Sequence, residues 1–122
     1  MAPKVVEMGL EFNQFVEEGS CSFYGAPIAI IVTIDRQFPK LRYLDVGLSV
    51  SYLLLAAQAR GLATCPIGRV TAYGEEIADA LDLPDNKEIV LGIALGYADT
   101  HSPINRFKTE RENLDAFRSW YE

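Results

Sequence analysis

Residues 62–73 read LATCPIGRVTAY, and they lie between a long apolar segment and a chain end that carries arginine and lysine. Gly61 stands just before this stretch, and glycine is common after the last turn of a helix because it adopts a positive φ without strain. The order predicts a helix that ends at Gly61, a turn at PIG, residues 66–68, and a buried strand further on. That strand leads into the polar segment GYADTHSPINRFKTER, residues 96–111.

The length and composition predict a single domain. The chain has 122 residues, of which 49% are hydrophobic. That is enough for one core and too many for a disordered chain. We expect an N-terminal helix within residues 1–22, a core at residues 23–97 and an extended C-terminal tail at residues 98–122.

The charge distribution limits the partners. The net charge is −6, from 11 Lys and Arg against 17 Asp and Glu. Nucleic-acid binding generally needs a basic face that neutralises phosphates, so we expect no nucleic-acid partner. A local anion site remains open, because the chain end holds four cations: Arg106, Lys108, Arg111 and Arg118.

Cysteine and histidine are scarce. Cys21 and Cys65 lie far apart without a CxxC motif, which favours two free, buried thiols in a reducing compartment. Because His101 is the only histidine, we expect neither a metal site nor a histidine-based triad. No stretch has the pattern of a secretory signal or of a membrane span, so we expect a cytoplasmic protein.

Apolar patterns predict two strands and two amphipathic helices. The strands are β-branched runs at residues 28–34 and 89–95, and Gly92 and Gly96 near the second one indicate close backbone approach. An N-terminal helix should end at Gly19. A second helix, EEIADALDL, should end before Pro84 and bury a stripe formed by Ile77, Ala80 and Leu81.

The segment at residues 46–60 predicts a helix that is apolar nearly all round, with Asp45 as its N-cap. Such a helix must be covered on every side, and a core of this size can scarcely do that alone. Part of it should therefore pack on a second subunit. A short terminal helix behind Asn113 also needs a surface on which to dock, since it carries Leu114, Phe117, Trp120 and Tyr121.

No residues form an evident acid–base or nucleophilic set, and we expect no catalytic side chain. Glu75, Glu76 and Asp79 fall on the solvated face of a short helix, where surface charge is the ordinary interpretation. An enzyme is still compatible with this sequence, because a cofactor can carry the reaction while the protein binds and orients it.

Four blocks resemble one subgroup of the FMN-dependent nitroreductase family in order and spacing. They are FYGAPIAIIVTIDR, YLDVGLSVSYLLLAAQARGLATCP, LDLPDNKEIVLGIALGYAD and SPINRFKTERENLDAF, which together cover nearly everything from Phe23 onward. The resemblance implies an α+β fold with a small mixed β-sheet flanked by helices. It also implies an intertwined homodimer in which the C-terminal segment crosses to the partner.

The resemblance assigns a flavin site. Pro66, Ile67 and Gly68 match the turn whose backbone N–H groups face the N5/O4 edge of the isoalloxazine ring, where a glycine permits close approach. Arg106 matches the arginine that reaches the FMN phosphate, and Lys108 would assist it. The alternatives are an ordinary turn at residues 66–68 and a solvated Arg106 held by Asp99 or Glu110.

The first 22 residues depart from the family, because its members usually open with an arginine-rich segment that contacts the phosphate and ribityl groups. Here that stretch holds Lys4 and no arginine, so we expect a truncated member whose remaining half-site holds FMN weakly or not at all.

The resemblance favours a flavin-dependent oxidoreductase that passes hydride from NAD(P)H through FMN to a nitroaromatic or quinone-like acceptor. The alternative is a non-catalytic dimeric scaffold or ligand-binding remnant of the same fold.

Overall fold

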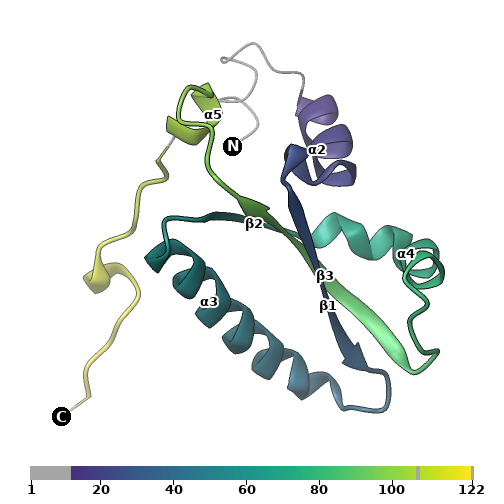
Figure 1. Cartoon of the computed structure of the whole chain (residues 1–122). Coiled ribbons are helices and arrows are strands. Elements are labelled where there is room, and N and C mark those ends of the chain that lie inside the picture. The colour runs from purple at the N-terminus through teal and green to yellow at the C-terminus, as the bar shows by residue number, and fades with distance from the viewer. Residues whose placement is uncertain (1–11, 107, 122) are drawn as a thin grey trace.

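The structure is a computed structural model that describes residues 12–106 and 108–121, with side chains from residue 16 onward. Helices and strands alternate along the chain (Figure 1). They are α2 (Phe12–Cys21), β1 (Ile28–Asp35), α3 (Tyr43–Ala59), β2 (Ala63–Ile67), α4 (Gly74–Ala80), β3 (Lys87–Gly96) and α5 (Pro103–Arg106). Figure 1 shows α3 on one side of the sheet and α4 on the other.

The sheet has three strands in the order β1-β3-β2. Ile93 of β3 lies opposite Ile30 of β1 and Pro66 of β2, and its side chain is fully buried. The α+β class, with a small sheet flanked by helices, is confirmed. Within the described residues, however, both pairings are antiparallel rather than mixed, because the central strand β3 runs opposite to each neighbour.

The glycines of β3 lie where other side chains come close. A Cβ placed on Gly92 would lie 2.9 Å from Phe23 Cε1 and 3.1 Å from Val70 Cγ1. A Cβ on Gly96 would lie 2.7 Å from Cδ of Pro27. The predicted close approach is confirmed, and these contacts hold the segment before β1 and the turn after β2 against the central strand.

The helix α2 continues past Gly19 to Cys21, so the predicted end at Gly19 is wrong. The glycine serves the packing of an aromatic ring instead, because a Cβ at this position would collide with the ring of Tyr24. The early part of the predicted helix, residues 5–11, lies outside the described residues.

The helix α3 begins at Tyr43, after a 3-10 turn, so Asp45 is not its N-cap. Asp45 lies in the first turn and forms an ion pair with Arg42 at 3.0 Å. The predicted end is confirmed. Gly61 has φ 73°, its N–H donates to Gln58, and the next N–H, of Leu62, donates to Ala57, both at 3.0 Å.

The turn predicted at residues 66–68 is instead a strand end. Pro66 and Ile67 belong to β2, and a 3-10 segment, η3 (Gly68–Tyr73), follows. Proline disfavours a strand in sequence reasoning, but β2 is an edge strand, where proline is tolerated.

Two further helix predictions are corrected. The helix α4 ends at Ala80, and Asp82 adopts φ 50°, so Ala80 and Leu81 are exposed while Leu83 packs against the core. The expected terminal helix is a single 3-10 turn at Leu114–Ala116, without a side-chain cap from Asn113.

The thiols of Cys21 and Cys65 are free, but both residues are exposed, so the predicted burial is wrong. Neither cysteine belongs to the small core formed by Ile67, Val70, Ile89 and Ala94 or to the residues packed against it.

Candidate functional site

At the end of β2, a buried residue is followed by a residue that borders free space. The side chain of Ile67 is 4% exposed and lies in the core, opposite Gly92 of β3. Gly68 follows, and a Cβ placed on it would meet no atom of the described residues within 4 Å. Pro66 is exposed on the other side of Ile67. The buried residue thus anchors the backbone while its two neighbours border free space.

The backbone conformation does not require a glycine at position 68, since its φ is not in the left-handed region. What the glycine provides is the free space where a side chain would otherwise lie. The segment after it is held locally, because the Thr71 hydroxyl donates to the Gly68 carbonyl at 2.9 Å and Val70 is buried. The backbone at Gly68 is therefore held in place and open to a flat ligand.

The predicted phosphate ligands lie on the tail. Arg106 ends α5, is exposed, and donates from its guanidinium to the His101 carbonyl at 3.1 Å. Asp99, one of its two alternative partners, accepts the His101 N–H instead, at 2.9 Å. Within the described residues Arg106 forms no ion pair with a carboxylate, so its charge remains available to an anion.

Lys108 is also exposed, two residues beyond Arg106. The strand register separates these cations from Gly68. Ile67 lies opposite Gly92, whereas the tail leaves β3 after Gly96, four residues or roughly 13 Å further along the strand. The structure therefore does not bring the two parts of the predicted site into one cluster, and a ligand that used both would have to be elongated.

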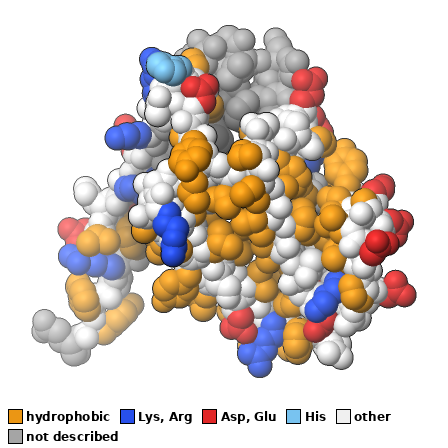
Figure 2. All heavy atoms as spheres, viewed as in Figure 1, with side chains coloured by type: hydrophobic (Ala, Val, Ile, Leu, Met, Phe, Trp, Pro, Cys, Tyr) orange, Lys and Arg blue, Asp and Glu red, His pale blue; other side chains and the backbone are white. Residues whose placement is uncertain are grey.

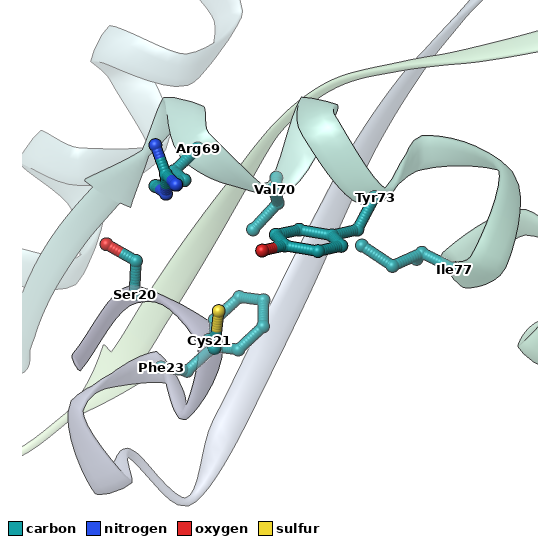
Figure 3. A pocket seen from close by; sticks show the side chains of 7 residues that line it. All are labelled: Ser20, Cys21, Phe23, Arg69, Val70, Tyr73 and Ile77. Carbon is teal, nitrogen blue, oxygen red and sulfur yellow. The ribbon is translucent and has the colours of Figure 1, made fainter. Parts of the chain in front are cut away.

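Sequence reasoning missed a pocket beside Gly68. A cavity of about 260 Å³ lies between the end of α2 and the segment η3, and Arg69 is one of its lining residues (Figure 3). Its apolar part is formed by Phe23, Val70 and Ile77. Arg69 directly follows the quoted PIG motif, but its surroundings depend on residues far away in the sequence.

Among the described residues, the pKa values of two titratable groups, Cys65 and Tyr43, are raised. Partial burial raises the pKa of the Cys65 thiol, and a hydrogen bond to the Glu88 carboxylate raises the pKa of the Tyr43 hydroxyl. Both shifts favour the protonated, uncharged form, so neither creates an activated nucleophile. Glu75, Glu76 and Asp79 are exposed, in agreement with the interpretation as surface charge.

The described residues contain no group of three His, Cys, Asp or Glu side chains that could hold a metal ion. In the same part of the chain, no helix combines the length and apolar character that crossing a membrane requires.

A sequence model of the nitroreductase family matches residues 4–97, and the chain belongs to this family. It is 42% identical over 95 residues to a 4-nitrobenzoate reductase from Pseudomonas putida, covering 78% of this chain and 42% of that protein. It is 36% identical over 104 residues to a 4-nitrobenzoate reductase from Nocardioides, covering 84% and 42%. The chain thus spans about two fifths of the length of these relatives.

Solved structures agree on the fold. The FMN-dependent nitroreductase NfnB from Mycobacterium smegmatis, in complex with NADPH, superposes with a TM-score of 0.84 at 24% identity, over 97% of this chain and 55% of that one. A point mutant of the FMN and NADPH-dependent nitroreductase NfnB from Sphigopyxis gives a TM-score of 0.81 at 28% identity, over 86% and 47%.

Proposed function

We propose that this protein is an FMN-dependent oxidoreductase of the nitroreductase type. The observation that carries the proposal is the open space beside Gly68, at a fixed strand end inside the segment that matches the family. A flat ring system can reach the main chain there, because no side chain of the described residues would fill the position of a Cβ.

The residues of this chain would divide the binding of FMN between them. Ile67 fixes the strand end, while Pro66 and the backbone at Gly68 border the isoalloxazine ring. For the phosphate, Arg106 supplies a guanidinium that has no carboxylate partner among the described residues, and Lys108 supplies a second exposed charge. The bound cofactor would accept hydride from NAD(P)H and pass electrons to an acceptor. Relatives named for the reduction of 4-nitrobenzoate favour a nitroaromatic acceptor over a quinone-like one.

The protein is further proposed to act as a cytoplasmic homodimer. The exposed hydrophobic residues Leu44, Leu48, Tyr52 and Leu55 recur at helical spacing along α3, with exposures between 62% and 74%. Hydrophobic side chains also spread over the middle of the face shown in Figure 2, and charged ones lie mainly at its margins. Burial against a second subunit would contribute about 1.5–3 kcal/mol for each large side chain. The exposed aromatic residues of the tail would bind the partner in the same assembly.

The test is an absorbance scan of the purified protein, then a titration with FMN, and a turnover assay with NAD(P)H and 4-nitrobenzoate. We expect FMN to bind and NAD(P)H oxidation to depend on both FMN and the nitroaromatic. Absence of FMN binding at millimolar concentration would overturn the proposal and favour the non-catalytic scaffold. FMN binding without turnover would overturn its catalytic part.

A further inference from the structure

The pocket between α2 and η3 has one apolar end and one polar end. Phe23, Val70 and Ile77 form the apolar end. Figure 3 shows the Tyr73 hydroxyl pointing toward the part of the pocket where Arg69 and Ser20 lie. An apolar wall opposite a few polar groups is the usual composition of a small-molecule site.

The size of the pocket limits its ligand. Its volume of about 260 Å³ lies below the range of roughly 300–1,000 Å³ of typical drug-sized sites. A dry apolar cavity of about 150 Å³ is already sufficient for benzene. The dimensions therefore suit one substituted aromatic ring.

The polar end indicates an anionic substituent. The Arg69 guanidinium forms an ion pair with Glu17 of α2 at 2.5 Å, and both side chains are nearly half exposed, at 43% and 47%. Such a pair contributes only about 0–1 kcal/mol, so Arg69 can exchange its carboxylate partner at little cost. The Tyr73 hydroxyl makes no hydrogen bond to the described residues and is free to donate one.

The backbone around the pocket is constrained. Phe23 and Tyr24 both adopt positive φ, of 50° and 53°, which is uncommon for residues other than glycine. The Phe23 ring packs closely against Gly92, since a Cβ placed on that glycine would lie 2.9 Å from its Cε1. Strained residues of this kind persist where surrounding contacts determine them, often beside ligand sites.

We propose that this pocket binds a single-ring aromatic carboxylate, with the ring against Phe23 and Ile77 and the carboxylate on Arg69 in place of Glu17. The proposal concerns binding alone and does not rest on the redox reaction of the proposed function. Arg69 directly follows Gly68, so the pocket begins one residue from the proposed flavin contact. Binding itself requires neither flavin nor nicotinamide.

The test is a calorimetric titration of the full chain with benzoate, and with benzamide as an uncharged probe of the same shape, in the absence of FMN and NAD(P)H. We expect benzoate to bind at least about tenfold more tightly than benzamide, since a hydrogen-bonded charge pair replaces a neutral contact. Arg69→Gln should abolish this difference. Equal affinities of the two probes, or no benzoate binding at 10 mM, would overturn the proposal.

A second variant should change the benzoate affinity in the opposite direction. Glu17→Gln removes the carboxylate that competes for Arg69 and should strengthen benzoate binding severalfold. Glu75→Gln, which removes an exposed carboxylate of α4, is the matched control and should leave affinity unchanged. Equal gains in the two variants would show a general effect of net charge and overturn the assignment to Arg69. Because no redox step is measured, failure here is distinguishable from failure of the FMN test.

Discussion

Substitution of Gly68 by alanine should weaken FMN binding while it leaves the stability of the fold nearly unchanged. A methyl group at this position meets no atom of the described residues within 4 Å, and the φ of Gly68 is not in the left-handed region. The free energy of unfolding should therefore change by no more than about 0.5 kcal/mol. The same methyl group would occupy the space that the flavin ring needs in order to reach the main chain.

The expected loss of FMN affinity follows from the contacts that this methyl group would prevent. The oxidised ring is uncharged, and leaving one of its hydrogen-bonding atoms without a backbone partner would cost about 1–3 kcal/mol. That loss corresponds to a roughly 5- to 150-fold higher Kd. The Kd is measured by the quenching of FMN fluorescence, and stability by thermal unfolding of the protein without ligand.

The control is Gly74→Ala, because a Cβ on Gly74 also meets nothing within 4 Å and its φ is likewise not positive. This glycine begins α4, away from the end of β2. The control should preserve both stability and FMN affinity. If Gly68→Ala is folded and binds FMN within about twofold of the unchanged protein, Gly68 does not lie beside the ring and the proposed site is wrong.

Four further outcomes are expected. Gly92→Ala should lower the free energy of unfolding by about 1–3 kcal/mol, measured by urea denaturation, because the added methyl group would overpack the core between two side chains; an unchanged midpoint would contradict the close packing. Arg106→Ala should weaken FMN much more than riboflavin, since only FMN carries a phosphate, and equal losses would assign the arginine a structural role. Leu48→Glu should leave a folded monomer in sedimentation analysis, because this side chain is 62% exposed within one chain; a dimer that persists would exclude this face of α3 as the interface. In a Cys21→Ser variant, alkylation of Cys65 should reach half its maximal rate at a higher pH than alkylation of free cysteine under the same conditions, because partial burial raises the pKa of the thiol and the reactive thiolate forms only at higher pH; an equal or lower midpoint would contradict this.

Local sequence patterns were sufficient for the two long strands and for the end of the long helix. A continuous β-branched run predicts a strand wherever it occurs, and residues 28–34 and 89–95 form β1 and β3. Gly61 ends α3 because only glycine adopts its positive φ without strain. The same reasoning failed at Gly19, because the sequence does not distinguish a glycine required for close packing from one that ends a helix.

The candidate site was only partly predictable from the sequence, because long-range strand pairing decides which of its residues are buried. The PIG motif and the tail cations are visible in the sequence, but the register of β2 on β3 decides that Ile67 is buried and Gly68 open. That pairing is long-range, and the short, proline-containing β2 has no local sequence pattern from which the pairing could be predicted. Arg69 could not be connected with a pocket, because its partner Glu17 comes from a helix that precedes the whole sheet.

The sequence by itself thus determined the family, through the resemblance of its four blocks, and with the family the α+β class. The two long strands and the apolar character of α3 also followed from it, because they depend on composition, periodicity and local backbone preference. Tertiary structure alone decided which glycines are open and which are closely packed, which carboxylate faces Arg69, and which face of α3 a single chain leaves exposed. The physical reason is that burial and ion pairing are properties of surfaces brought together by strand pairing, and residues adjacent in space here are distant along the chain.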